Sequence, residues 1–504
     1  MNSRREFLSL SLALGSTACR LTPAGPRFEE LSLAQVAAEI ARGRMSAQGA
    51  ARQYLARIAA IDPQLHAVIE VNPDAMRVAA ERDAQSPARR GPLHGVPILI
   101  KDNIDTADRM QTTAGSLALT GAPAPERDAA LVARLRVAGA VILGKTNLSE
   151  WANIRSSRST SGWSARGGQT HNPHALDRNP SGSSSGSGAA VAASLCAGAV
   201  GTETDGSIVS PASINGIVGL KPTVGLISGQ GIIPISHSQD TAGPMTRTVE
   251  DAALLLSAMN ERGLDYRGAL KPGALRGARI GIARSLFGRH PGIGEMARRS
   301  IEAMTRAGAV IVDPIALPET SEYGAAEFEV LLYELKANLN AYLAGRRGAP
   351  VKTLAEVIAF NEREAAREMP HFGQENLLLA EAKGPLTDKV YLEAREKAKR
   401  LAAGGIDAAM EKDNLTAIAA PTDSPAWLTD YVSGDHYLQG CSTPAAVAGY
   451  PHITVPAGLV AGLPVGWSFF GRAHSEETLL GLAHAFESAT RARRAPRLTP
   501  HATA

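Results

Sequence analysis

The feature that most constrains the fold is an alternation of helical stretches with short apolar runs of strand length. Eight such runs are spread along the chain: AVIEV, PILI, AVILG, ARIGIA, AVIVDP, AIAAP, HITVPAG and GWSFFG. A unit of helix, glycine and strand occurs twice, as ARLRVAGAVILGK and AMTRAGAVIVDP. Alternation of this kind predicts an α/β fold whose sheet is largely buried on both faces.

Two serines indicate where the first helices begin. Ser32 and Gln35 form the pattern of a capping box, and they precede apolar residues at helical spacing. Ser46 is placed to cap the next helix. We therefore expect two helices directly after the segment PAGPRF.

The strand patterns stop between about residue 321 and residue 412. Three stretches there, EFEVLLYELKANLNAYL, TLAEVIAFNEREAAREM and DKVYLEAREKAKRLAAGGIDAAM, combine high helix propensity with paired charges. Strand patterns resume at Ala417, and no boundary has the composition of a linker. We expect one domain over residues 26–504 that contains a helical insertion over about 321–412.

Residues 1–25 predict an export signal. Arg4 and Arg5 precede a short, weakly apolar run that ends in small residues, which is typical of a twin-arginine signal and too short for a stable membrane span. Cys19 follows STA, as in part of a lipoprotein cleavage site, although Ser16 stands where leucine is preferred. We expect export to the periplasm, with a lipid anchor at Cys19 as one alternative and a cytoplasmic tail as another.

Charge and cysteine content argue against several classes of protein. The chain has 504 residues, and its 52 basic and 49 acidic residues give a formal net charge of +3, so nothing favours nucleic acid or an anionic membrane as partner. Its three cysteines, Cys19, Cys196 and Cys441, form no CxxC pair, and no HExxH motif occurs. We predict no metal site and no cofactor.

A serine- and glycine-rich run, NPSGSSSGSGAAVAAS at residues 179–194, has several interpretations. Such runs are often flexible linkers. This one, however, leads directly into AAVAASLCAGAVG, which we predict to be a tightly packed helix. Glycines before a helix expose backbone N–H groups that suit an anion or a developing oxyanion. A structural or binding loop is therefore favoured over a linker.

The same run also matches a nucleophile elbow. Gly182 to Gly186 fit G-x-S-x-G, which would make Ser184 the nucleophile. The preceding residues, GGQTHNPHALDRNP, are polar and rich in turn formers, so no strand leads into an elbow. No histidine further along identifies itself as the partner base.

Two other segments contribute side chains that could take part in catalysis. GVPILIKDN places Lys101 at the end of an apolar strand, where burial would lower the lysine pKa and let it act as a base. GTETDGSIVSPASINGIVGLKPT places Ser207 in a tight turn, after residues whose successive N–H groups could converge on one oxygen. Taken singly, Lys101 could be a surface lysine, Ser207 a helix cap, and Ser183, in the serine- and glycine-rich run, an ordinary loop residue.

These segments together make the chain resemble the amidase signature family. The resemblance covers nearly all of the chain after the export segment, and its motifs also include LHGVPILIKDNID, VILGKTNLSEWA, DTAGPMTRTVEDAALLL and GLPVGWSFFGR. It implies an α/β fold with a large mixed β-sheet covered by helices on both faces. It also implies acyl transfer by a Ser–cis-Ser–Lys triad, carried here by Ser207, Ser183 and Lys101.

The family mechanism assigns a step to each of these residues. Ser207 would attack the amide carbonyl, while Ser183, held by a cis peptide bond, passes the proton to neutral Lys101 and later returns a proton to the leaving amine. Water then hydrolyses the acyl-enzyme. The backbone N–H groups before the nucleophile would form the oxyanion hole: Thr204, Asp205 and Gly206.

The chain departs from the family pattern at four positions. Asp205 stands where many members have glycine, so its carboxylate must point away from the oxyanion. Ser181 and Ser185 also replace common glycines. Val209 replaces a common arginine, which removes an obvious partner for an acidic substrate.

The segments GTETDGSIV, RGGQTHNP and NPSGSSSGSGAAVAA most resemble the bacterial peptide amidase branch, which releases ammonia from C-terminally amidated peptides. We expect a short peptide amide or a small amide as substrate, and a monomer or homodimer. Alternatives are an amidase or esterase of small aryl or aliphatic amides, a component of a tRNA-dependent amidotransferase complex, and an inactive peptide-binding relative. We expect the pocket walls to come from the helical insertion and from SGDHYLQGCSTPAAVAGYP.

Overall fold

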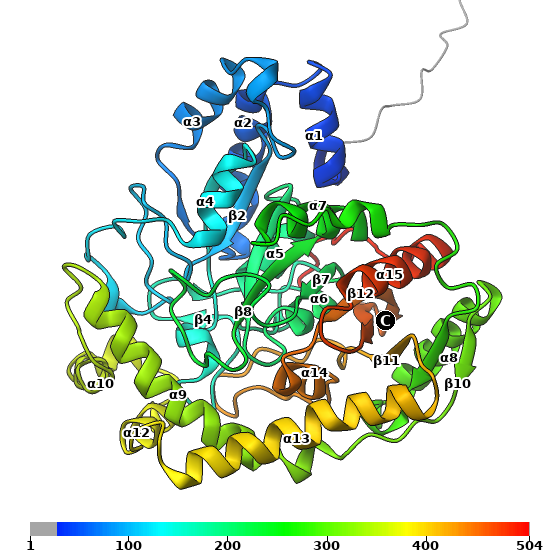
Figure 1. The fold of residues 1–504 in the computed structure, drawn as a ribbon. Helices are drawn as coiled ribbons and strands as arrows, with labels where there is room; N and C mark the ends of the chain where they lie inside the picture. The colour runs from blue at the N-terminus through cyan, green and yellow to red at the C-terminus, as the bar shows by residue number, and fades with distance from the viewer. Residues whose placement is uncertain (1–27, 503–504) are drawn as a thin grey trace, which may run out of the picture.

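The structure, a computed structural model, describes residues 28–502 (Figure 1). The predicted export signal, with Arg4, Arg5 and Cys19, lies outside the described residues and stays a prediction. Within residues 28–502, no helix is both long enough and apolar enough to cross a membrane.

The core is an eleven-stranded mixed sheet, which confirms the expected fold class. Its strand order is β1-β3-β2-β6-β8-β7-β12-β13-β11-β9-β10. Strands β3, β2 and β6 are parallel to one another, as are β11, β9 and β10, whereas the pairs between these groups are antiparallel. The strands are β1 Val68–Val71, β2 Pro97–Lys101, β3 Val141–Thr146, β6 Gly198–Glu203, β7 Val218–Lys221, β8 Thr241–Thr246, β9 Arg279–Ile282, β10 Val310–Val312, β11 Ala417–Pro421, β12 His452–Val460 and β13 Leu463–Phe470. A separate hairpin pairs β4 Trp163–Ser164 with β5 Gly168–Gln169.

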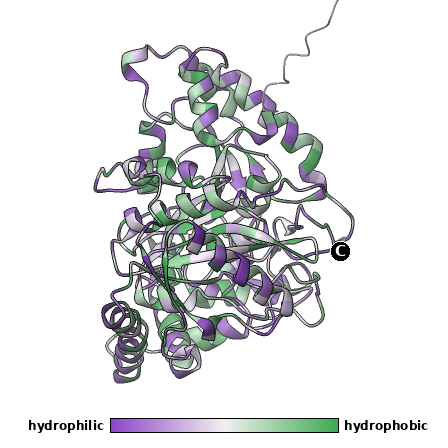
Figure 2. Cartoon of the chain, turned by 90° about the vertical axis from the view of Figure 1, so that its right-hand side faces the viewer, coloured by the Kyte–Doolittle hydropathy of each residue, from purple (hydrophilic) through white to green (hydrophobic). Residues whose placement is uncertain are grey.

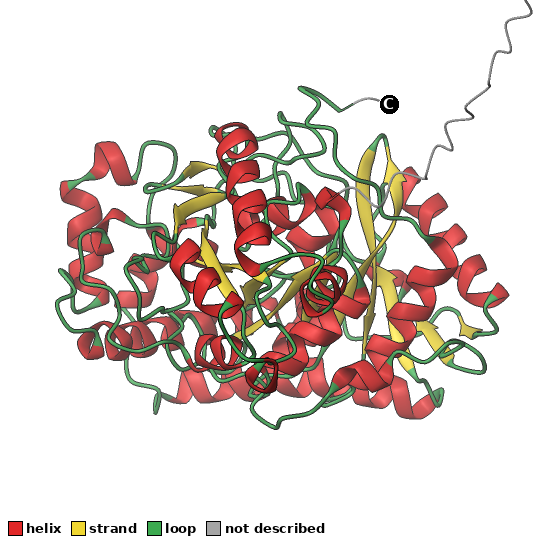
Figure 3. Ribbon diagram, turned by 90° about the horizontal axis from the view of Figure 1, so that it is seen from above, coloured by secondary structure: helices red, strands yellow, loops and turns green. Residues whose placement is uncertain are grey.

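Helices surround this sheet (Figure 3). Helix α2 packs on β2 and β3, α5 packs on β2, β3 and β6, and α15 packs on β12 and β13. Figure 2 shows hydrophilic residues on the outer helices, as expected for helices that bury one side. The helices are α1 Leu33–Ala41, α2 Ala47–Ile61, α3 Ala75–Asp83, α4 Ala130–Val137, α5 Ser185–Ala192, α6 Val209–Ile214, α7 Val249–Met259, α8 Pro291–Arg306, α9 Gly324–Gly345, α10 Leu354–Arg363, α11 Ala365–Glu368, α12 Glu375–Glu381, α13 Lys389–Lys412, α14 Thr443–Ala448 and α15 Glu476–Thr490.

The predicted helix starts agree with the structure. Ser32 and Gln35 form the capping box of α1, and the Ser46 hydroxyl accepts a hydrogen bond from Gly49 N at the start of α2. Between β10 and β11 the chain forms α9 to α13 and no strand, and α13 packs against α9 and α14.

The helix predicted over AAVAASLCAGAVG was too long. Helix α5 ends at Ala192, and the chain then enters β6 at Gly198. This strand is fully buried between β2 and β8. Small residues pack well in either kind of element, so the position in the centre of the sheet decided the outcome.

Candidate active site

Lys101 lies at the end of β2 and is fully buried. Its Nζ atom donates to Ser183 Oγ at 2.8 Å and to Ser184 Oγ at 3.0 Å. It also contacts Thr202 Oγ1 at 2.9 Å and Thr202 O at 3.1 Å. Burial lowers the pKa of this amine to about 7, although the charges of Asp240 and Glu203 oppose the shift. Because an amine with this pKa is partly neutral near pH 7, Lys101 can accept a proton.

Ser183 sits in the loop that leads into α5. The Gly182–Ser183 peptide bond is cis, and Ser183 O accepts a hydrogen bond from Ser149 N at 3.1 Å. Ser181, two residues earlier, has a φ of +59°, a value that glycine adopts more readily than serine. Its hydroxyl pairs with Ser210 Oγ at 2.7 Å, which compensates for this backbone conformation. The loop therefore accommodates a side chain at position 181.

Ser207 lies in the turn between β6 and α6, close to the Ser183 loop. Its carbonyl oxygen accepts a hydrogen bond from Ser184 N at 3.1 Å, which joins the two segments. Ser207 is only 8% exposed, and within residues 28–502 its hydroxyl makes no hydrogen bond, including none to Ser183. It does not cap α6, since the N-cap position is Ile208. The hydroxyl is therefore not engaged in a structural contact.

The turn before Ser207 depends on a glycine. Gly206 has a φ of +78°, and a Cβ at this position would lie 3.0 Å from Ser442 Oγ. Asp205 Oδ2 accepts from Thr443 Oγ1 at 2.7 Å, so its carboxyl group is directed to the start of α14. The segment SGDHYLQGCSTPAAVAGYP therefore contacts the turn before Ser207 through Thr443.

Asp205 lies beside a second carboxyl group from the helical segment. Burial and the charge of Asp205 raise the pKa of Glu327, in α9, well above its usual value. The Glu327 carboxyl also accepts from Gln239 Nε2 at 3.0 Å. The direction of this shift disfavours a second negative charge beside Asp205.

Two buried acids that the sequence analysis missed organise this region. Glu203 Oε2 accepts from the N–H groups of Ile208 and Val209 at 2.7 and 3.0 Å, and so holds the chain directly after Ser207. Asp423 accepts a hydrogen bond from Ser210, and burial raises the pKa of its carboxyl to about 8. Asp423, Ser210 and Ser181 therefore connect the loop after β11 with both serine segments. In the sequence, the one sign of this role was that an acidic residue, Glu203, stands directly before the segment TDGS.

Ser184 does not have the environment of an elbow nucleophile. It is fully buried, and its hydroxyl donates to Thr202 O at 3.0 Å and accepts from Lys101. Residues 170–184 before it form turns and isolated bridges, so no strand leads into it. The position of Ser184 indicates a structural role beside the lysine.

Metal ligands are not grouped in the described part of the chain. No cluster of three or more His, Cys, Asp or Glu residues is arranged there to hold a metal ion. Cys196 and Cys441 are buried free thiols, and burial raises the pKa of each to about 12.

Comparison with known proteins defines the class of protein as an amidohydrolase. The family model described as Amidase matches residues 50–480. The chain belongs to the amidase signature family.

Its relatives include peptide amidases, other amidases and components of amidotransferases. The native peptide amidase of Stenotrophomonas maltophilia superposes with a TM-score of 0.89 at 50% identity, over 93% of this chain and 99% of that chain. A protein of Arabidopsis thaliana named as a probable amidase is 41% identical, over 93% of this chain and 92% of its own length. The A component of the glutamyl-tRNA(Gln) amidotransferase of Pseudomonas syringae is 33% identical, over 92% of this chain and 98% of its own length.

Proposed function

We propose that this amidase removes ammonia from C-terminally amidated peptides, with Ser207 as nucleophile, Ser183 as relay and Lys101 as base. The observation that carries the catalytic assignment is the 2.8 Å hydrogen bond between a fully buried Lys101 and Ser183, at a lysine whose pKa is about 7. The peptide substrate is supported by the 50% identity to a peptide amidase, whose structure with the competitive inhibitor chymostatin superposes with a TM-score of 0.90.

In the acylation step, Ser207 Oγ forms a bond to the amide carbon. Its proton passes to Ser183, and the Ser183 proton passes to the neutral Lys101 amine. The same relay then returns a proton to the amide nitrogen as the C–N bond breaks and ammonia leaves. An amide requires this assistance because an unprotonated amide nitrogen is a poor leaving group.

The oxyanion would be held by the backbone N–H groups of Thr204, Asp205 and Gly206, each of which typically contributes about 3 kcal/mol to the transition state. The contact of Asp205 with Thr443 supports this role, because it draws the carboxylate towards α14. Water then attacks the acyl-enzyme, gives its proton to the relay, and releases the free acid.

The experiment that tests the substrate measures ammonia release from an amidated dipeptide and from a panel of simple aliphatic and aryl amides. We expect turnover of the amidated dipeptide and no cleavage of its internal peptide bond. Turnover of the simple amides alone would contradict the peptide assignment and would leave the small-amide alternative.

A second candidate, a component of an amidotransferase complex, is favoured by the 33% identity to the Pseudomonas syringae protein over 92% of this chain. The arginine pair Arg4-Arg5 argues against it, since a tRNA-dependent complex works inside the cell. ATP-dependent activity that requires co-purifying partner proteins would support this candidate, and hydrolysis by the isolated chain would exclude it.

We further propose that the protein is exported by the twin-arginine route and acts in the periplasm as a monomer or homodimer. The support is the sequence of the first 25 residues. Lipid attachment at Cys19 is the alternative to a soluble form. Cell fractionation, with and without detergent, distinguishes the soluble form from the lipid-anchored form.

A further inference from the structure

Lys221 is the last residue of β7, and the proposed mechanism does not use it. The side chain is fully buried, and its Nζ atom has no hydrogen-bond partner within residues 28–502. Removal of an ammonium group from water is costly unless nearby groups compensate for its charge. The groups that surround Lys221 therefore indicate what its charge does.

Lys221 and Glu203 project from the same face of the sheet, the face on which the Ser207 turn and α6 lie. Strand β8 separates their two strands. A Cβ at Gly243 in β8 would lie 3.0 Å from Ile208 Cδ1, and a Cβ at Gly219 in β7 would lie 3.1 Å from Ile208 O. Lys221 follows Gly219 by two residues and so points to the same side, because side chains alternate along a strand. Glu203 reaches Ile208 N from this side as well.

Three carboxyl groups face the Lys221 ammonium group. They belong to Glu203, to Glu476 at the start of α15, and to Asp205 in the turn, and the charge of Glu203 has the largest effect. Burial lowers the pKa of Lys221 to about 8, although these charges oppose the shift, so the amine is mainly protonated at pH 7. His452, which pairs with Lys221 from β12, is neutral there, because burial lowers its pKa to about 3.

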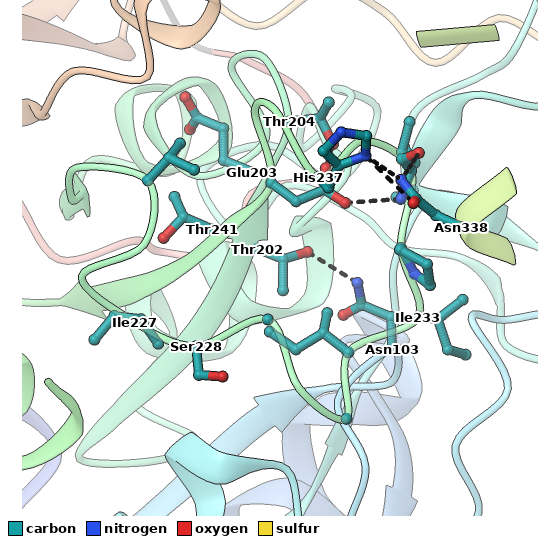
Figure 4. Close-up of a pocket in the computed structure, with 18 of the residues that line it drawn as sticks. Asn103, Thr202, Glu203, Thr204, Ile227, Ser228, Ile233, His237, Thr241 and Asn338 are labelled. Atoms are coloured by element: carbon teal, nitrogen blue, oxygen red, sulfur yellow. Dashed lines mark hydrogen bonds between the residues drawn. The ribbon is translucent and has the colours of Figure 1, made fainter. Parts of the chain in front are cut away.

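Glu203 in turn depends on Lys221 for its negative charge. Burial raises the pKa of Glu203, and the charge of Lys221 is the largest influence that opposes this shift. Its Oε2 atom accepts from the N–H groups of Ile208 and Val209, while Oε1 is buried and has no partner within the described residues. Figure 4 shows the pocket that Glu203 helps to line, and the carboxyl group points away from Asn103.

The other titratable groups near Glu203 do not supply a positive charge in its place. Lys101 must be neutral to act as the base, and the charge of Asp205 raises the pKa of Glu203 further. The Tyr437 hydroxyl and the Cys441 thiol stay neutral, since desolvation raises the pKa of each. The charge that keeps Glu203 ionised is therefore the one at the end of β7.

We propose that Lys221 is a positioning residue, whose ammonium charge keeps Glu203 ionised so that its carboxylate holds the chain directly after Ser207. This inference rests on the proposed function, in which Ser207 is the nucleophile. Hydrogen bonds from N–H groups to an ionised carboxylate are roughly twice as strong as those to a neutral group. A protonated Glu203 therefore holds Ile208 and Val209 less firmly, and a nucleophile that is less well placed reacts more slowly.

The loss caused by removal of the Lys221 charge should depend on pH. A neighbouring positive charge lowers the pKa of a carboxyl group, so its removal raises the pKa of Glu203. At pH 6 the variant then holds Glu203 in the protonated form, which binds the two N–H groups less well. At pH 9 Glu203 is ionised with or without Lys221. A merely structural role of Lys221 would cost the same activity at both pH values.

The first test measures kcat/KM for ammonia release from an amidated dipeptide at pH 6 and pH 9, with circular dichroism to confirm folding. Relative to the unmodified protein at the same pH, we expect Lys221→Met to lose at least about tenfold at pH 6 and no more than about threefold at pH 9. Equal losses at the two pH values, or no loss at pH 6, would overturn this inference.

The second test repeats the substitution in the Glu203→Gln variant. Because the carboxylate on which Lys221 acts is gone, we expect Lys221→Met to lower kcat/KM at pH 6 by no more than about twofold in this background. The same loss in both backgrounds would mean that Lys221 acts independently of Glu203, and would overturn the inference.

Lys221→Arg is the matched variant that keeps the charge, and it tests the inference even if Lys221→Met does not fold. The ratio of its kcat/KM values at pH 9 and pH 6 should equal that of the unmodified protein within about threefold. A ratio raised about tenfold or more would overturn the inference. Absence of ammonia release by the unmodified protein at both pH values would instead overturn the proposed function.

Discussion

Acidification from pH 8 to pH 5 should remove the activity by protonating the Lys101 amine. The base must be neutral to accept a proton, and burial lowers its pKa from 10.5 to about 7. Below this value the neutral fraction falls tenfold for each pH unit, so kcat/KM at pH 5 should be roughly 100-fold lower than on the plateau above pH 8. The sign follows from the direction of the shift, since protonation of Lys101 inactivates the relay.

The assay is ammonia release from an amidated dipeptide well below KM, from pH 5 to pH 9 at constant ionic strength, with circular dichroism to confirm that the protein stays folded. Asp240→Asn is the matched variant, because the charge of Asp240 is the largest influence that opposes the lowered pKa of Lys101. Its removal should move the acid limb to lower pH without abolishing it. A flat profile between pH 5 and pH 9, or an acid limb unaffected by Asp240→Asn, would refute the reasoning.

Three further predictions concern the turn at Gly206, the buried carboxyl group of Asp423 and the predicted export signal. Gly206→Ala should cost ~1 kcal/mol of stability in thermal melts, because the residue has a φ of +78°. In steady-state kinetics it should lower kcat by at least about tenfold, because the added Cβ lies 3.0 Å from Ser442 Oγ and shifts the N–H groups proposed to hold the oxyanion. Burial raises the pKa of Asp423 from 3.8 to about 8, so its contribution to stability is fully present below its unfolded pKa and is lost as the pH rises through the folded pKa. Asp423→Asn should therefore flatten the fall in Tm between pH 5 and pH 8. A fall in Tm identical to that of the unmodified protein would contradict this. Replacement of Arg4 and Arg5 by lysine should leave the protein in the cytoplasmic fraction, whereas unchanged export would exclude the twin-arginine route.

The outer strands of the sheet were predictable from sequence, whereas those at its centre were not. The eight runs correspond to β1, β2, β3 and β9 to β13, because each is mainly apolar and of strand length. Strands β6, β7 and β8 contain Gly, Thr and Pro instead. A Cβ at Gly243 in β8 would lie 2.0 Å from Leu220 O, so close packing required a residue with low strand propensity.

The candidate triad of Lys101, Ser183 and Ser207 came from the resemblance to the amidase signature family, because the local G-x-S-x-G pattern pointed to Ser184 instead. The structure joins Lys101 to the hydroxyl groups of both Ser183 and Ser184. Glu203 and Asp423 were missed because each acts on a backbone N–H or hydroxyl group that only the fold brings near. Apart from the position of Glu203 directly before the TDGS turn, no local pattern indicated the role of either residue.

The most direct test of the catalytic assignment compares ammonia release from an amidated dipeptide by Ser207→Ala and by Ser184→Ala. The account predicts that Ser207→Ala loses activity by at least about 10⁴-fold, because the nucleophile is gone. Ser184→Ala should keep turnover with a loss of no more than about tenfold, since Lys101 retains its contacts with Ser183 and Thr202. The reverse result, with activity lost in Ser184→Ala and kept in Ser207→Ala, would contradict it.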